Sequence, residues 1–169
     1  MNNLPHIHSW QRLVQRFIAI PAVTRFFEPI LITADLWLLR YTGYRHSFTS
    51  LLAGFPIIIL TTTGAKSGLQ RTLPLVGIPD GDNFILIASN FGRPHHPGWY
   101  YNLKANPQAI VHGSGHSGSY LAHQAESGEL PHLWQMADYI YTGYPSYRQH
   151  AGKRQIPIVV LEPAPDDAN

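Results

Sequence analysis

The sequence predicts an α+β fold in which helices precede a small antiparallel β-barrel. Three observations predict it: helical spacing of apolar residues in the first 50 positions, short β-branched segments afterwards, and tight turns between those segments. With 169 residues, 44% of them hydrophobic, the chain has enough material for one self-sufficient core. We therefore expect a single domain over 1–169, with a helical extension at 1–50, a barrel core at 55–163 and a tail at 164–169.

The N-terminal extension reads as helices rich in apolar side chains and arginine. Residues 9–20, with Ser9 as a cap, have the spacing of a helical stripe, and a second helix follows Pro21. Pro29 is expected to kink or divide that second helix. The stripe of the first helix consists of Trp10, Leu13, Val14, Phe17 and Ile18. Two interpretations stay open: a cap packed on the core, or an interfacial region that lies on anionic lipid or gathers a lipophilic substrate.

No segment of the sequence is apolar for long enough to cross a membrane, and the start does not resemble a secretory signal. We expect a cytoplasmic protein, with the inner face of the membrane as the alternative location, reached by peripheral contact through the N-terminal helices.

The barrel is predicted from six short strands, with helices at 98–105 and 129–141 between them. The strands are expected at 56–63, 72–79, 83–89, 109–112, 119–123 and 156–162. The segment GSGHSG at 113–118 has the letters of a dinucleotide-binding fingerprint, but it lies between two strands with no helix after it. We interpret it as a hairpin turn.

Composition excludes several classes of function. The chain has no cysteine, so it has no disulfide framework, no thiolate metal site and no cysteine nucleophile. A net charge of +2 is too small for a nucleic-acid-binding surface, and the ten histidines show no metal-ligand spacing. Charged residues make up only 13% of the chain, which favours a surface that meets a ligand, a partner or a membrane.

The turn between the first two predicted strands carries the clearest chemical signal. Gly64 and Gly68 allow close approach of backbone N–H groups to a ligand, and Lys66 and Arg71 place cations on either side. Such a corner binds phosphate or carboxylate. The alternative is an ordinary hairpin with two solvated cations.

Two further segments carry candidate pocket residues. Ser89 ends the third strand, and the loop and aromatic helix after it can form the floor and wall of a pocket for a flat ring. For Trp99 the alternative is that it anchors its helix to the barrel. Tyr141, Tyr144 and Tyr147 recur at i, i+3 and i+6, nearly one helical face, and amphipathic packing is the alternative for them.

Five segments in this order resemble the deazaflavin-dependent nitroreductase family, whose members use coenzyme F420: TTTGAKSGxxRxxPL, IASNFG, PGWYYNLKANP, YPSY and IPIVVLEP. They cover roughly residues 56–163. The resemblance implies a split β-barrel related to flavin-binding oxidoreductases. It also implies hydride transfer from reduced F420 to an electron-poor acceptor, namely a quinone, an enone or a nitroaromatic compound.

By the same resemblance, Lys66, Ser67 and Arg71 hold the phosphate and oligoglutamate tail of the cofactor. Ser89, Tyr144 and Tyr147 are expected to be catalytic, and one of the two tyrosines or His150 is expected to supply the proton. Tyr144, Tyr147 and His150 are expected to form the substrate pocket. The predicted cofactor-binding set is Thr63, Lys66, Ser67, Arg71, Pro74, Ile87, Ala88, Ser89, Asn90, Gly92, Arg93, Trp99, Tyr100 and Asn102.

The chain departs from the family pattern at three positions. Ala65 stands where Arg or Lys is usual, which removes one tail contact. Arg93 replaces a second glycine and either meets the tail or narrows the pocket. His150 replaces a third tyrosine and supplies a titratable group.

Two other functions stay open from the sequence. The same barrel binds FMN or haem in related proteins, so an FMN-dependent reductase is one alternative. The other is a non-catalytic protein that binds deazaflavin or lipid. We expect a small-molecule substrate, no nucleic acid, no metal, and either a monomer or a homodimer.

Overall fold

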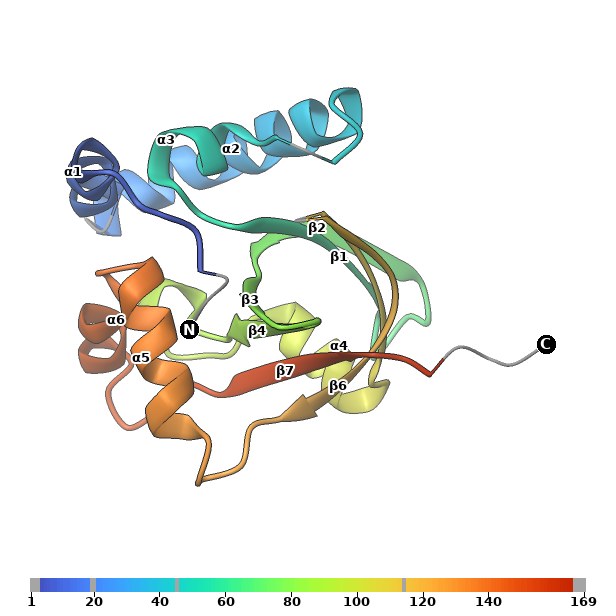
Figure 1. The fold of residues 1–169 in the computed structure, drawn as a ribbon. Coiled ribbons are helices and arrows are strands. Elements are labelled where there is room, and N and C mark those ends of the chain that lie inside the picture. The colour runs from blue at the N-terminus through green and yellow to red at the C-terminus, as the bar shows by residue number, and fades with distance from the viewer. Residues whose placement is uncertain (1–3, 19–20, 45, 114, 166–169) are drawn as a thin grey trace.

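Seven strands form one curled antiparallel sheet in the computed structural model, which describes residues 4–18, 21–44, 46–113 and 115–165 (Figure 1). Their order across the sheet is β2 (Gln70–Val76), β1 (Ile57–Thr63), β5 (Gln108–Gly113), β6 (His116–Gln124), β7 (Ile158–Pro163), β4 (Asn83–Ile87) and β3 (Ile78–Asp80). The two edge strands, β2 and β3, are consecutive in the chain, so the sheet curls into a half-barrel. The predicted antiparallel barrel is confirmed.

One predicted strand is two strands in the structure. The segment expected at 72–79 is divided at Gly77, whose N–H donates to the carbonyl of Pro56. A Cβ on Gly77 would lie 2.7 Å from Ile58 Cδ1, so the chain presses against β1 at this point. There it changes partner from β1 to β4. The prediction of six strands is therefore corrected to seven.

The β1 strand is buried on both faces, as its run of branched apolar residues predicts. Ile58 and Leu60 pack with α4 (Gly98–Ala105) in one core cluster, while Ile57 and Ile59 belong to a second cluster. That second cluster lies against α5 (Leu130–Ile140) and α6 (Tyr144–His150). The sheet thus separates a cluster under α4 from a cluster that includes the tyrosines of the YPSY segment.

The GSGHSG segment lies in a hairpin. Gly113 at the end of β5 pairs with His116 at the start of β6, and the strands are antiparallel. Ser114 lies outside the described residues. The interpretation as a hairpin turn, not a dinucleotide site, is confirmed.

The N-terminal helices lie together beside β1 and β2 (Figure 1). They are α1 (Ser9–Ile18), α2 (Pro21–Tyr41) and α3 (Phe48–Ala53), and α3 begins with a reciprocal capping box between Ser47 and Ser50. Helix α2 continues through Pro29, so the expected division there is wrong. Within the described residues no helix is both long and apolar enough to cross a membrane.

The apolar stripe predicted for helix α1 is divided: Val14 and Ile18 pack against the core, and the other members are exposed. Trp10, Leu13 and Phe17 are 50%, 56% and 67% exposed, whereas Gln15 is fully buried. The Gln15 amide donates to the carbonyls of Ala53 at 2.8 Å and Ile140 at 3.0 Å. A buried amide with its donors satisfied is an acceptable core residue. Trp10, Leu13 and Phe17 are therefore left on the outside of the molecule.

Candidate functional site

A mostly apolar cavity of about 360 Å³ lies beside the edge of β2. Its walls come from β2, from the end of β4 and the loop that follows it, from α6, and from parts of α1 and α2. The volume is at the lower end of the range of ligand-binding pockets, which is about 300–1,000 Å³. The cavity has space for a flat ring with a small partner beside it.

The loop after β4 reaches the cavity in an unusual backbone conformation. Asn90, Phe91 and Gly92 have φ values of 48°, 57° and 73°, and two of these residues are not glycine. Left-handed conformations at non-glycine residues cost free energy and persist only where the surroundings impose them. The Asn90 amide donates to the carbonyl of His95 at 2.9 Å, which closes the loop on itself. Ser89 at the start of this loop lines the cavity and is 9% exposed.

Arg154 holds this loop from the other side of the chain. Its guanidinium donates to the carbonyls of Arg93 at 3.0 Å, Ala88 at 3.1 Å and Ser89 at 2.6 Å. Burial lowers the pKa of Arg154, yet a guanidinium stays charged in proteins. Sequence reasoning missed this residue, because its partners lie 61–66 positions away and no local pattern marks it.

His96 completes the contacts of Arg154. Its Nδ1 lies 3.1 Å from Arg154 Nη1, and it accepts this hydrogen bond when the ring is neutral. Burial, then the charges of Arg154 and Lys104, lower the pKa of His96. A neutral His96 is therefore the form that supports the loop at neutral pH.

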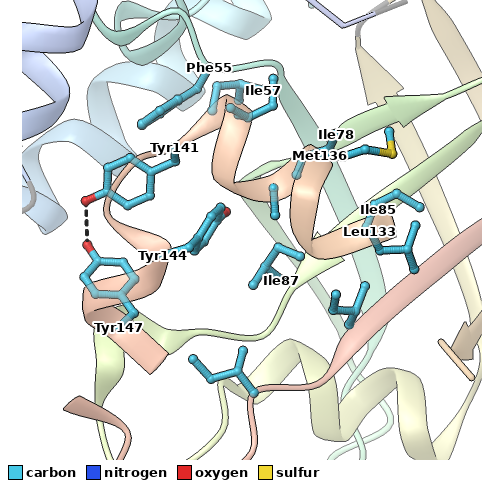
Figure 2. Packing of buried hydrophobic residues seen from close by; sticks show 14 of the residues in the cluster. Phe55, Ile57, Ile78, Ile85, Ile87, Leu133, Met136, Tyr141, Tyr144 and Tyr147 are labelled. Carbon is cyan, nitrogen blue, oxygen red and sulfur yellow. Dashed lines mark hydrogen bonds between the residues drawn. The ribbon is translucent and has the colours of Figure 1, made fainter. Parts of the chain in front are cut away.

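Three buried tyrosines form one wall of the cavity (Figure 2). The hydroxyls of Tyr141 and Tyr147 are 3.0 Å apart, and the Tyr144 ring meets the Tyr141 ring edge to face at 5.2 Å. Phe55 also meets the Tyr141 ring edge to face, at 5.2 Å. Tyr141 follows the end of α5, so the three tyrosines do not share one helical face as expected.

Burial is the largest cause that raises the pKa of Tyr141 and of Tyr144, and the neighbouring Tyr147 adds to it in both cases. These two phenols are therefore protonated at neutral pH. A protonated hydroxyl can donate a hydrogen bond to a ligand oxygen.

The turn between β1 and β2 is exposed at Lys66, Ser67 and Arg71. Arg71 and Leu73 share one face of β2, and Leu73 lines the cavity, so Arg71 lies about 7 Å beyond the apolar wall along the strand. Across the described residues, neither Lys66 nor Arg71 has a side-chain partner. This arrangement places positive charge next to an apolar slot.

Most backbone N–H groups of this turn are used inside the protein. Those of Gly64 and Gly68 donate to carbonyls within the turn, and that of Leu69 donates to Ser67 Oγ at 3.3 Å. Asn102 accepts the Ala65 N–H at 3.0 Å and donates to Thr62 Oγ1 at 3.0 Å. The backbone N–H groups expected to approach a ligand are thus mostly engaged within the protein, and the side chains of Lys66 and Arg71 are the exposed cationic groups of the turn. Asn102 supports the turn from α4.

The structure brings only part of the sequence-predicted set to the cavity. Pro74, Ile87, Ser89, Asn90, Trp99, Tyr144 and Tyr147 line it. Thr63, Lys66, Ser67 and Arg71 lie at or next to the turn, and Ala88, Gly92, Arg93, Tyr100 and Asn102 do not line the cavity.

His150 and Tyr100 are used elsewhere. His150 is exposed on α6, where its Nδ1 lies 2.8 Å from the carbonyl of Ser146, and it does not line the cavity. The Tyr100 hydroxyl donates to Gln124 Oε1 at 2.9 Å. Residues that sequence reasoning did not predict for the cavity include Phe55, Phe91 and Tyr141.

Comparisons with known proteins agree on one family. The model of the F420H(2)-dependent quinone reductase family matches residues 37–163. An F420H(2)-dependent quinone reductase of Mycobacterium tuberculosis is 38% identical over 112 residues, which cover 63% of this chain and 72% of that protein. A second protein of that organism, named a putative F420H(2)-dependent quinone reductase, is 32% identical over 66% of this chain and 96% of its own length.

Solved structures give the same likeness. One described as an F420-H2 dependent reductase has a TM-score of 0.58 and 37% identity, covering 63% of this chain and 94% of that chain. Another structure, described as a domain-swapped dimer, has the same TM-score and identity. The match covers 63% of this chain and 80% of that one. The expectation of a split barrel of this type is confirmed.

Proposed function

The chain belongs to the F420H(2)-dependent quinone reductase family, and we propose that its cavity holds F420 and a quinone next to each other. The prediction of an F420-dependent oxidoreductase, made from the five sequence segments, is confirmed at the level of the family. The observation that carries the proposal for this site is the junction of an exposed cationic turn with a tyrosine-walled apolar cavity.

The residues of the site fit a deazaflavin with an anionic tail. Lys66 and Arg71 are exposed cations at the end of the slot and suit phosphate and carboxylate groups. At Gly64 a Cβ would lie 2.7 Å from Ser67 Oγ and 3.1 Å from the Leu69 carbonyl, so a side chain at this position would crowd the turn. The apolar walls at Leu73 and Trp99 suit a flat ring. Reduced F420, when bound there, supplies a hydride.

Ser89 is the residue we propose beside the ring. Its hydroxyl has no protein partner within the described residues, while its carbonyl is fixed by Arg154. The hydroxyl is therefore free to hydrogen-bond a ligand in the cavity and to stabilise negative charge that develops there. Arg154 keeps the hydroxyl in place through the backbone.

Tyr147 is the residue we propose as the proton donor. It lines the cavity and is 5% exposed, so its proton moves to a bound acceptor and not to bulk water. A donor at fixed distance supplies general-acid catalysis. Tyr144 and Phe55 shape the acceptor side and exclude water from it.

The acceptor that the family name gives is a quinone, and the cavity suits other flat, electron-poor compounds as well. We extend the proposal to enones and nitroaromatic compounds as weaker acceptors. The walls are mainly apolar and aromatic, so they select a ligand by its shape more than by its hydrogen-bonding groups.

We also propose that the N-terminal helices lie on an anionic membrane surface. Trp10, Leu13 and Phe17 form an exposed apolar stripe on α1, and Trp37 on α2 is 61% exposed. Exposed Arg16 lies on α1 among these apolar residues, as is typical of interfacial helices. Phe17→Ser should reduce cosedimentation with anionic liposomes at physiological salt, with Leu69→Ser on the distant turn as the control. Equal binding of both variants would contradict this proposal.

Two measurements test the proposed function. Titration with oxidised F420 and with FMN, followed by tryptophan fluorescence, should show tighter binding of F420; the reverse order would favour the FMN-dependent alternative. Reoxidation of F420H2 with menadione as acceptor should proceed at a rate proportional to enzyme. Binding of F420 with no turnover of any quinone, enone or nitroaromatic acceptor would favour a non-catalytic binding protein.

A further inference from the structure

The hydroxyls of Tyr141 and Tyr147 meet at the cavity, 3.0 Å apart (Figure 2). Both residues are buried, at 6% and 5% exposure, and they come from different elements, the end of α5 and the middle of α6. The family resemblance points to the tyrosines of the YPSY segment and gives no role to Tyr141. The pair is therefore a feature of this chain that needs its own explanation.

Tight packing fixes the direction of the Tyr141 side chain. Its ring lies over the backbone of Gly143, where a Cβ would come 2.2 Å from Tyr141 Cζ and 2.4 Å from its hydroxyl oxygen. Phe55 and Tyr144 each meet the ring edge to face at 5.2 Å. A side chain held on three sides keeps its hydroxyl at one position, next to Tyr147.

The positions of the two rings show which of the two hydroxyls lies on the side of the loop after β4. Tyr147 lies next to the loop after β4: its ring meets the Phe91 ring edge to face at 6.3 Å, and a Cβ on Gly92 would lie 3.4 Å from its carbonyl. Tyr141 lies on the side of Phe55. The hydroxyl of Tyr147 is therefore the one on the side of the loop that carries Ser89.

Two hydroxyls share one hydrogen bond, so only one of the two hydrogens lies between the oxygens. A hydroxyl that accepts a hydrogen bond is a stronger donor itself. If Tyr141 donates to Tyr147, the hydrogen of Tyr147 can point to a bound acceptor, and the phenolate left after proton transfer keeps a hydrogen bond from Tyr141.

We propose that Tyr141 is a positioning residue that donates its hydrogen bond to Tyr147 and so enables Tyr147 to protonate the quinone. This role rests on the proposed function. The hydride that F420H2 would supply reduces the quinone by two electrons and leaves oxidised F420, and Tyr147 supplies the proton that completes the hydroquinone. The O–H bond of Tyr147 breaks and a new O–H bond forms on the quinone oxygen. Tyr147 is then a phenolate until solvent returns the proton.

Tyr141→Phe tests the role, because it keeps the ring contacts with Phe55 and Tyr144 and removes only the hydroxyl. With menadione as acceptor, kcat should fall roughly tenfold, the effect of one hydrogen bond to a charged group, while KM for menadione and the Kd for F420 change less than about twofold. Tyr139→Phe on α5 is the matched control, since its ring is 44% exposed, and it should keep the wild-type kcat.

The double variant gives the sharper result. Because Tyr141 acts through Tyr147, adding Tyr141→Phe to Tyr147→Phe should lower kcat no further. Stability measured without cofactor should show the same coupling. The loss of unfolding free energy in the double variant should be smaller than the sum of the losses in the two single variants.

Four outcomes overturn the inference or the proposed function in distinguishable ways. Wild-type kcat in Tyr141→Phe would show that the hydroxyl has no role in turnover. Multiplicative losses of kcat in the double variant would show that Tyr141 acts independently of Tyr147. A wild-type protein that does not oxidise F420H2 with any quinone would overturn the proposed function itself, while additive unfolding free energies would overturn the hydroxyl pair whatever the activity.

Discussion

The two ends of the site are built in opposite ways. At the turn between β1 and β2, Lys66 and Arg71 are exposed, and no other side chain holds them in place within the described residues. At the tyrosine wall, Tyr141 and Tyr147 are buried, hydrogen-bonded to each other and in ring contact with Phe55, Tyr144 and Phe91. One end relies on charge in water and the other on fixed geometry in a mostly apolar cavity.

This difference teaches which property each end can control. Exposed charges attract an anionic tail over a distance that salt shortens, so they determine affinity and change little else when removed. Buried hydroxyls act only on a ligand already in place, so they determine the rate of the bound complex. Substitutions at the two ends should therefore separate binding from turnover.

The largest expected effect comes from Tyr147→Phe, because it removes the proposed proton donor. We expect kcat with menadione to fall roughly a hundredfold, the lower end of general-acid contributions, with the Kd for F420 unchanged. Stopped-flow reoxidation of F420H2 measures the first quantity and fluorescence titration the second. A loss of F420 affinity equal to the loss of kcat would contradict the separation of binding and turnover between the two ends of the site.

Arg154→Gln should disturb the interior end through the loop it holds. The substitution leaves the carbonyls of Ala88, Ser89 and Arg93 without their donor, so the free energy of unfolding should decrease by roughly 3 kcal/mol. Chemical denaturation measures it, with Lys153→Gln, the exposed neighbour, as the control. Equal stability of the two variants would mean that the loop does not depend on Arg154.

Gly143→Ala is a more local test of the tyrosine wall. Its new methyl group would overlap the Tyr141 ring, so the ring must move and the protein should lose about 2 kcal/mol of stability, as overpacked cores do. The kcat should fall as in Tyr141→Phe. Gly118→Ala is the control, because its Cβ would meet no atom within 4 Å. Wild-type turnover in Gly143→Ala would contradict the fixed position of Tyr141.

The smallest effect is on the pH dependence of stability. The pKa values of Tyr141 and Tyr144 are raised in the folded protein, so these phenols keep their protons where the same groups in the unfolded chain ionise, near pH 10. Their contribution is complete below pH 10 and is lost as pH rises above it. Tyr141→Phe/Tyr144→Phe should therefore lose less stability between pH 9 and pH 11 than the wild type, measured by denaturation with urea. An equal loss would contradict the burial of these hydroxyls.

The turn and the tyrosine wall also differ in how well the sequence predicts them. The turn is local: glycines, a lysine and an arginine within eight residues are enough to indicate an anion-binding corner. The order of five segments gave the family, and the β-branched run of β1 gave a strand buried on both faces. These features depend on neighbours in the chain, which a sequence displays directly.

The features that could not be predicted depend on distant contacts. Arg154 is identified only by carbonyls more than 60 residues away, and the packing of the Tyr141 ring depends on Phe55, which is far from it in the sequence. The apolar pattern of helix α1 does not predict that Gln15 is buried, because this depends on two carbonyl acceptors in distant parts of the chain. Gly77 divides a strand because Ile58 occupies the space of its Cβ, which no local pattern reveals.

The affinity for F420 as a function of salt tests the central claim most directly, namely that Lys66 and Arg71 bind the cofactor's tail and the interior performs the reaction. For Lys66→Ala/Arg71→Ala, we predict a Kd for oxidised F420 raised roughly a hundredfold at low salt, with a weaker dependence on ionic strength. The kcat at saturating F420H2 and the melting temperature should match the wild type. An unchanged Kd in the double variant, with the wild-type salt dependence, would contradict the account.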